Sequence, residues 1–315
     1  MQAQIKKIGI AGAGTMGAAF AHIFAESGFF VTLYGTKESS LARARKIIET
    51  NQNNMLREGL FDSDVVKDSR DRITFTTELK DLQDMDFILE AIVEDLKIKQ
   101  KFWGEISRLV EESTLMATNT SGLSITKLSE SVVNKRSFAG MHWWNPPHLI
   151  PLVEIIRGEQ TADETIQTLV KLARHLNKKP VVVNKDVPGF IGNRLQYALL
   201  REALHIVEEG IATEKDVDDA MKYGLGFRYA GLGPIETVDL GGVDVFNKVG
   251  AYLFRELNSS PELPKKMRKL YEQGDYGIKT GRGFYDYSQG KDKEVLQKRD
   301  AHFVKMLKHI YKVNL

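Results

Sequence analysis

The chain begins with a strand-like segment, residues 7–11, that runs directly into the glycine-rich stretch GAGTMG at residues 12–17. The stretch fits the pattern G-x-G-x-x-G. In that pattern the first glycine permits a tight turn, the second lets a pyrophosphate approach the backbone, and the third lets helix and strand pack closely. The N-terminus of the following helix supplies N–H donors. A glycine-rich turn without a ligand has the same letters, but the order of strand, motif and helix favours a dinucleotide site. The residues expected to contact the cofactor here are Gly12, Gly14, Thr15, Met16 and Gly17.

The first half of the chain alternates short apolar runs with helical segments. This alternation predicts parallel strands joined by crossover helices, and therefore an α/β domain of the Rossmann-like kind. The expected strands cover residues 7–12, 29–35, 84–92, 114–121, 138–144, 152–156 and 180–184. The expected helices cover residues 15–27, 38–58 and 98–110, with another that starts at a capping-box-like Thr161–Glu164.

After residues 185–190 (KDVPGF) the pattern changes to long amphipathic helices without strand-like runs. In the first of them, Leu195, Leu199 and Ala203 fall on one face, and Thr213 is the expected start of the next helix. We therefore expect an NAD(P)-binding domain over residues 1–185 and an all-α domain over residues 186–315.

Composition excludes several classes of protein. Lys and Arg total 44 against 42 for Asp and Glu, so no strong field points to nucleic acid or to a membrane surface. The chain has no cysteine, which excludes disulfides and thiolate sites and fits a reducing cytoplasm. We expect no signal peptide, and no apolar run approaches the roughly 18 residues of a membrane span. Histidines and carboxylates show no ligand spacing, so we predict no metal. We expect a cytoplasmic protein whose partners are small molecules or copies of itself.

A histidine and a glutamate are predicted to meet across a hairpin. His142 lies in one apolar strand and Glu154 in the next, at equal distances from a turn centred near His148. A glutamate in an apolar strand is costly without a partner, and a histidine can supply one, its tautomer and charge fixed by the carboxylate. The pair is either a structural ion pair or an oriented general base. Beside a nicotinamide site, we favour the base.

The second strand ends without the acidic residue that usually binds the adenosine ribose. Gly35 stands at that position, followed by Thr36 and Lys37. Without the carboxylate a 2′-phosphate is no longer repelled, and Lys37 can pair with one. NADP therefore becomes a credible alternative to NAD, which stays the expected cofactor.

Together these residues resemble the 3-hydroxyacyl-CoA dehydrogenase family across nearly the whole chain. Seven motifs occur in family order. They are GAGTMG (12–17), EAIVED (90–95), NTSGLSI (119–125), GMHWWNPP (140–147), LVEII (152–156), KDVPGFIGNRL (185–195) and KTGRGFYDY (279–287). The resemblance implies a Rossmann-like domain, a helical domain that forms a homodimer, a place in fatty acid metabolism, and NAD-linked interconversion of 3-hydroxyacyl and 3-ketoacyl groups.

The resemblance also implies roles for individual residues. His142 corresponds to the catalytic base and Glu154 to its orienting partner, while Ser121 and Asn193 correspond to polar groups around the reacting oxygens of the substrate. Ser121 and Asn193 could equally be helix caps. The positions that correspond to further cofactor contacts are Glu94, Lys99, Ser121, Asn145 and Lys279.

Two departures from the family pattern bear on the substrate. By counting, the positions of the family's CoA-contacting serine and lysine hold Asn51 and Glu58, and a glutamate would repel CoA phosphates. Residues 224–236 (GLGFRYAGLGPIE) resemble the branch with lambda-crystallin, gulonate 3-dehydrogenase and carnitine dehydrogenase, in which Arg228 would grip a free carboxylate. Arg228 as a surface residue or a dimer contact is ranked ahead of that role.

Three functions remain open at this point. The first, which is the leading prediction, is a dehydrogenase that acts on a 3-hydroxyacyl-CoA such as 3-hydroxybutyryl-CoA. The second is the same chemistry on a free 3-hydroxy acid, which Glu58 and Arg228 favour. The third is a non-catalytic dinucleotide-binding protein, against which the His142/Glu154 pair argues.

Overall fold

The computed structural model describes residues 5–309, which fall into two compact units that divide between Arg194 and Leu195. We call residues 5–194 the first unit and residues 195–309 the helical unit. The domain boundary that the sequence predicts near 185 lies shortly before this division.

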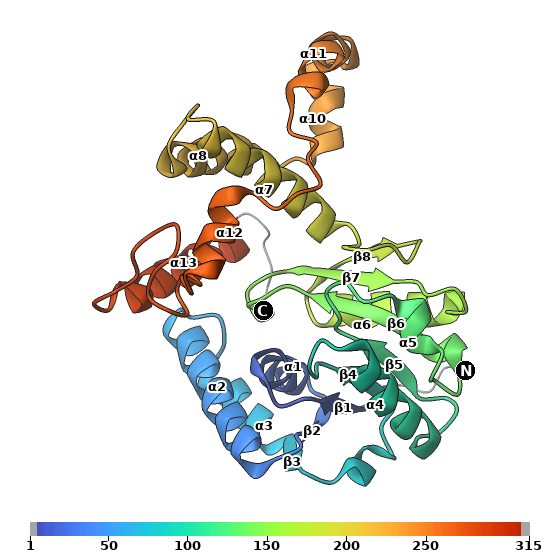
Figure 1. Ribbon diagram of the computed structural model, residues 1–315. Helices are drawn as coiled ribbons and strands as arrows, with labels where there is room; N and C mark the ends of the chain where they lie inside the picture. The colour runs from blue at the N-terminus through green and yellow to red at the C-terminus, as the bar shows by residue number, and fades with distance from the viewer. Residues whose placement is uncertain (1–4, 310–315) are drawn as a thin grey trace. The chain divides into compact units, whose positions relative to one another are not determined.

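The first unit is built on an eight-stranded sheet with the order β3-β2-β1-β4-β5-β6-β7-β8 (Figure 1). All neighbouring strands run parallel except β6 and β7, which are antiparallel. The prediction of an α/β domain with parallel strands is therefore confirmed. The strands are β1 (Lys7–Ala11), β2 (Phe30–Tyr34), β3 (Ile73–Thr76), β4 (Phe87–Glu90), β5 (Leu115–Thr118), β6 (Phe138–Trp143), β7 (Leu152–Ile156) and β8 (Lys179–Val183).

Helices bury both faces of this sheet, each over its own apolar cluster. One cluster joins the sheet to α1 (Thr15–Glu26), α2 (Glu38–Arg57) and α6 (Asp163–His175). The other joins it to α4 (Leu96–Leu109) and α5 (Ile125–Ser129). Strands covered on both sides read as continuous apolar runs, which is why periodicity found most of them.

Helix α3 (Ser63–Asp71) and the edge strand β3 were not assigned from the sequence. The α3 segment SDVVKDSRD is charged and buries only Val66 and Ser69, and β3 has four residues of which only Thr76 is buried. Two 3-10 turns, η1 (Leu79–Leu82) and η2 (Lys135–Ser137), complete the first unit. Short, partly solvated elements of this kind carry a weak periodic signal.

The capping box predicted at Thr161 is wrong. Helix α6 starts one residue later than that box requires, with Ala162 as its N-cap and no side-chain cap. The Thr161 hydroxyl instead donates to the carbonyl of Phe138 at 2.7 Å and accepts from the N–H of Gly158 at 2.9 Å. A long-range contact that ties α6 to β6 has displaced the local cap.

The second unit is helical, as predicted. Thr213 caps α8 as expected, its side chain accepting from the N–H of Asp216. The elements are α7 (Gly192–Glu208), which starts in the first unit, α8 (Glu214–Ala220), the π-helical turn η3 (Met221–Leu225), α9 (Gly226–Tyr229), α10 (Pro234–Gly241), α11 (Val243–Glu256), α12 (Lys265–Glu272) and α13 (Lys291–His309). Within residues 5–309, no helix has the length and apolar character to cross a membrane.

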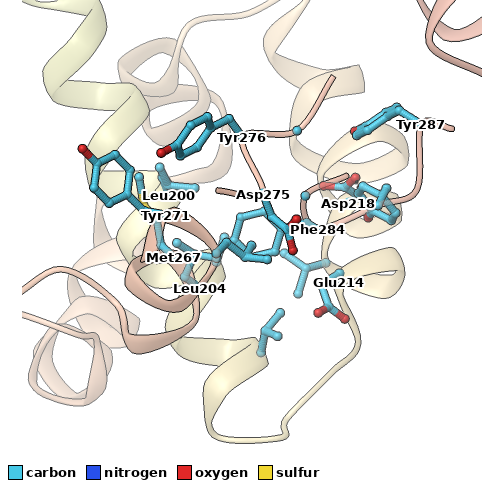
Figure 2. A pocket seen from close by; sticks show the side chains of 17 residues that line it. Leu200, Leu204, Glu214, Asp218, Met267, Tyr271, Asp275, Tyr276, Phe284 and Tyr287 are labelled. Atoms are coloured by element: carbon cyan, nitrogen blue, oxygen red, sulfur yellow. Dashed lines mark hydrogen bonds between the residues drawn. The ribbon is translucent and has the colours of Figure 1, made fainter. Parts of the chain in front are cut away.

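The helical unit holds a pocket of about 480 Å³ between α7, α8, α12 and the segment 275–287. Figure 2 shows its aromatic side chains, among them Tyr271, Tyr276 and Phe284, with the carboxylates of Glu214 and Asp218 at its margin. Both carboxylates are already engaged, Glu214 with Lys266 and Asp218 with Lys222 and the hydroxyl of Tyr285.

Candidate active site

The β6–β7 hairpin brings His142 and Glu154 face to face. The two residues are direct partners in the antiparallel register, as predicted from the sequence, and Nδ1 of His142 lies 2.8 Å from Oε2 of Glu154. His142 is 5% exposed and Glu154 is fully buried. Because an ionised carboxylate only accepts hydrogen bonds, the imidazole donates from Nδ1, which leaves the lone pair of Nε2 available for a proton.

The Glu154 carboxylate is held by four donors from two segments of the chain, residues 142–144 and 191–192. Oε1 accepts from the N–H groups of Ile191 and Gly192, both at 2.9 Å, and Oε2 accepts from His142 and from Nε1 of Trp144 at 3.3 Å. Burial raises the pKa of Glu154, but the hydrogen bonds from His142, Gly192 and Ile191 outweigh it, so the pKa is lowered. The carboxylate is therefore ionised at neutral pH and able to stabilise an imidazolium.

Ser121 and Asn193 lie next to each other at the start of α7. The side-chain amide of Asn193 donates to the carbonyl of Ser121 at 3.0 Å, and the N–H of Ser121 donates to Oε1 of Glu94 at 2.9 Å. The structure thus links three of the predicted site residues, from the loop after β4, the loop after β5 and the first turn of α7. Ser121 is exposed.

Lys99, a predicted cofactor contact, is buried in an ionic cluster. It is 1% exposed, and its ammonium pairs with the buried carboxylate of Glu90 and with Glu94, 3.3 Å away. The second oxygen of Glu90 accepts from the Thr118 hydroxyl at 2.8 Å. Lys99 therefore bears on the site through Glu94, and direct contact with the cofactor stays a prediction.

Glu90 was missed by the sequence analysis, although the signal was present. It ends the fully buried strand β4, and a carboxylate in a buried strand needs a partner. The same argument identified Glu154. The donors of Ile191, Gly192 and Trp144 had no such signal, because they depend on how α7 and the β6–β7 loop meet.

The glycine-rich turn fits a dinucleotide. Gly12 has φ 113°, and a Cβ there would lie 2.4 Å from the carbonyl oxygen of Ala91. A Cβ at Gly17 would lie 1.7 Å from the carbonyl oxygen of Gly12, so helix and strand meet backbone to backbone. A Cβ at Gly14 meets nothing within 4 Å, which leaves open space over the N-terminus of α1, where Thr15 and Met16 begin the helix. This is the cradle that a pyrophosphate requires.

At residue 35, where the family usually has an acidic residue, close packing also favours glycine. It is buried at the end of β2, where a Cβ would lie 2.8 Å from Cβ of Ala13 and 2.9 Å from Oγ of Ser40. The adjoining Lys37 is exposed at the N-cap of α2. The local packing therefore leaves no room for a ribose-binding carboxylate at residue 35.

Three further predicted residues are exposed. Asn145 lies in the loop between β6 and β7, close in sequence to the His142 pair. Arg228 lies on α9 and Lys279 in the turn 277–282, both in the helical unit. Their roles toward cofactor and substrate stay predictions.

Two family models match consecutive parts of the chain. Residues 7–187 match the NAD binding domain of 3-hydroxyacyl-CoA dehydrogenase, and residues 189–287 match the C-terminal domain of 3-hydroxyacyl-CoA dehydrogenase.

Individual relatives cover nearly the whole chain. The 5-formyl-3-hydroxy-2-methylpyridine 4-carboxylate 5-dehydrogenase of Mesorhizobium japonicum is 33% identical over 95% of this chain and 96% of its own length. A probable 3-hydroxybutyryl-CoA dehydrogenase of Deinococcus radiodurans is 36% identical over 89% of this chain and 100% of its own.

Solved structures agree with the sequence matches. The crystal structure of a 5-formyl-3-hydroxy-2-methylpyridine 4-carboxylic acid 5-dehydrogenase, described as an NAD⁺-dependent dismutase, superposes with a TM-score of 0.90 at 32% identity and covers 98% of this chain and 99% of that one. The (S)-3-hydroxybutyryl-CoA dehydrogenase of Ralstonia eutropha superposes with a TM-score of 0.75 at 32% identity, over 91% and 100% of the two chains.

Two family models and relatives above 30% identity span a fold whose glycine turn fits NAD and whose hairpin pairs a histidine with a glutamate. The chain therefore belongs to the 3-hydroxyacyl-CoA dehydrogenase family of NAD-dependent oxidoreductases that act on CH–OH groups.

Proposed function

We propose that His142 is the general base that removes the hydroxyl proton of a secondary alcohol as hydride leaves the same carbon. The buried His142–Glu154 pair carries this proposal, because it holds Nδ1 protonated and leaves Nε2 free to take a proton. Glu154 then stabilises the imidazolium that forms. In the reverse direction the imidazolium returns the proton to a carbonyl oxygen.

The remaining residues bind and orient the reactants. When bound, NAD supplies the hydride acceptor. The turn at Gly12–Gly17 and the N-terminus of α1 would hold its pyrophosphate, with Glu94 and Asn145 as further contacts. The Ser121 hydroxyl and the Asn193 amide stand as donors for the substrate oxygen, where they stabilise developing negative charge.

We propose a substrate with a free carboxylate ahead of the CoA thioester that the sequence put first. The amide of Asn51, one of the two expected CoA positions, faces α1 and lies 3.3 Å from Nε2 of His22. At the other position Glu58 presents a carboxylate, paired with Arg57. No cation therefore stands at either position to attract CoA phosphates, while Arg228 is exposed and suited to a carboxylate. The Mesorhizobium relative, named for a pyridine carboxylate, supports this choice.

A 3-hydroxyacyl-CoA such as 3-hydroxybutyryl-CoA is the second candidate substrate. It is supported by the names of the Deinococcus and Ralstonia relatives, each above 30% identity. A role of the protein in fatty acid metabolism would follow only if the substrate is a 3-hydroxyacyl-CoA.

A matched pair of substrates separates the two candidates. We expect NADH to be oxidised faster with acetoacetate or a bulkier free 3-keto acid than with acetoacetyl-CoA, and Arg228→Ala to raise KM for the free acid alone. Faster turnover of the thioester, with no effect of Arg228→Ala, would select the CoA substrate. His142→Gln should abolish both reactions. Tight NADH binding with no turnover of any hydroxy acid or thioester, and no effect of His142→Gln, would indicate a non-catalytic binding protein.

For the nicotinamide cofactor we propose NAD, with NADP still to be compared. The absence of a carboxylate at Gly35 and the exposed Lys37 favour tolerance of a 2′-phosphate. Binding of NADH and NADPH measured by fluorescence, in wild type and Lys37→Ala, tests this. Lys37→Ala should weaken the binding of NADPH and leave the binding of NADH unchanged.

We also propose that the protein acts in the cytoplasm as a homodimer through its helical unit. Support comes from large apolar side chains that α10 and α11 leave exposed, among them Ile235 at 76%, Leu240 at 73% and Phe254 at 79%. Such a surface on a helix pair is costly in water unless another protein covers it. Sedimentation analysis measures the oligomeric state directly.

A further inference from the structure

Trp144 contacts the catalytic pair in a way that the proposed mechanism does not use. Its indole Nε1 donates to Oε2 of Glu154 at 3.3 Å, the same oxygen that His142 contacts at 2.8 Å. The indole and imidazole ring centroids are 5.8 Å apart. One carboxylate oxygen is therefore shared between the base and a tryptophan.

Gly192 is what allows the indole to reach Glu154. A Cβ at residue 192 would lie 2.4 Å from the Trp144 ring carbon Cζ2, 3.1 Å from Cε2 and 3.4 Å from Oε2 of Glu154. Gly192 has an ordinary φ and does not need to be glycine for backbone reasons, since it is absent from the residues with positive φ. Its missing side chain leaves the space that the indole occupies, while its N–H holds the other carboxylate oxygen at 2.9 Å.

We propose that Trp144 is a positioning residue that, together with Gly192, sets the direction and the charge of the Glu154 carboxylate behind His142. Two N–H groups fix Oε1 and the indole N–H fixes the angle of Oε2, so the carboxylate cannot turn away from the imidazole. The indole also draws off part of the negative charge of Oε2. With its charge reduced, Oε2 holds a protonated His142 less tightly.

Among the described residues, the polar contacts of the two side chains of the pair come from β6, β7 and the segments that directly follow β6 and precede α7. From β6, β7 and the segment before α7, the groups that face it are the titratable His142 and Glu154 themselves, the Trp144 indole, the Phe190 ring 5.8 Å from the imidazole, and backbone N–H groups. From β8, Val181 stands opposite Glu154. The inference rests on His142 as the base of the proposed reaction.

The test combines Trp144→Phe, Gly192→Ala and the double variant. Trp144→Phe removes the donor and keeps a ring, so the acid limb of the profile of kcat/KM against pH should move upward. The expected loss is about 3- to 10-fold near pH 7, with wild-type activity recovered near pH 9. Gly192→Ala should displace the indole and lower activity further. In the double variant the Cβ meets a smaller ring, so activity should return to the level of Trp144→Phe alone. Trp103→Phe, a buried tryptophan on α4, is the matched control and should leave the profile in place.

A second measurement does not depend on turnover. Imidazole ¹⁵N NMR of the cofactor-free protein follows protonation of His142, and Trp144→Phe should move its midpoint to higher pH. An equal loss of activity at all pH values, an unmoved midpoint, or a harmless Gly192→Ala would show that Trp144 only fills space. If the wild type turns over no substrate, the proposed function fails, and the NMR midpoint still decides the role of Trp144.

Discussion

The two units of the protein differ in how completely each buries its own apolar side chains. The first unit encloses two apolar clusters, one on each face of its sheet. In the helical unit, among the described residues, only Leu204, Thr237, Val304 and Leu307 are buried. The first unit therefore holds the His142–Glu154 pair in a core that it completes by itself, whereas the helical unit carries apolar surface that it does not cover.

This difference shows in which part of the protein a buried charged group can be held in a fixed orientation. A carboxylate such as Glu154 can be kept buried and aimed only where every neighbour is fixed by dense packing. All three tryptophans of the chain, Trp103, Trp143 and Trp144, lie in the first unit, so their fluorescence reports on that unit alone. The comparison can thus be tested one unit at a time.

The largest effect is expected from Glu154→Gln in the first unit. The glutamine cannot offer an acceptor to both His142 and Trp144 while serving the two N–H groups on the other side, so a donor faces a donor. We expect kcat to fall about 10²- to 10⁴-fold, the range of a lost general base. Steady-state kinetics with circular dichroism as the folding control checks this, and a loss under threefold in a folded variant would contradict the assigned role.

Next in size is the effect of Phe254→Asp in the helical unit. Phe254 is 79% exposed on α11, and a charge placed in an apolar contact between copies should weaken association by about 2 kcal/mol or more. Sedimentation velocity should show monomers, while the tryptophan fluorescence of the first unit stays unchanged. Lys265→Asp on α12 is the control for added charge. Unchanged association in Phe254→Asp would show that α11 does not form the contact between copies.

A smaller, pH-dependent effect is expected from Lys178→Met, which removes a buried amine from the first unit. Lys178 donates to the carbonyls of Pro147 at 2.7 Å and Ile150 at 3.2 Å, and burial lowers its pKa to about 7. The unfolded chain, with a pKa near 10.4, then binds more protons between about pH 7 and 10. Wild-type stability should therefore rise with pH in this window, by at most about 1.4 kcal/mol per pH unit.

Lys178→Met should lose this slope. Urea unfolding followed by tryptophan fluorescence at pH 6.5, 8 and 9.5 measures it, with the exposed Lys171→Met on α6 as control. Parallel stability profiles for wild type and Lys178→Met would mean that Lys178 is charged and stabilised throughout.

The smallest effect is expected at Thr213, where the helical unit relies on a local contact. Its side chain caps α8, and Thr213→Ala should cost about 1 kcal/mol. Thermal unfolding followed at 222 nm checks this, with Thr213→Ser as the variant that keeps the cap. A loss of stability well above 1 kcal/mol would mean that the helical unit is packed as tightly around Thr213 as the first unit is around its sheet.

The outcome of the sequence predictions follows the same division between local and long-range contacts. The glycine turn and most strands were predicted because their signals are local, and the His142–Glu154 register followed from a short hairpin. The capping box at Thr161 failed because Phe138, far away in sequence, offered the hydroxyl a better partner. Glu90 was overlooked although it obeys the rule that found Glu154.

The sequence by itself determined the α/β architecture, the dinucleotide turn and the facing histidine and glutamate, because each depends on spacing within a short segment. Only the tertiary structure decided that Lys99 forms ion pairs with Glu90 and Glu94. It also decided that a Cβ at Gly35 would clash with its neighbours, and that the Trp144 indole reaches Glu154 across Gly192. These contacts join different strands, helices and loops, and one of them brings together Trp144 and Gly192, which are distant along the chain. Their geometry is set by how helices and strands pack, which no local pattern encodes.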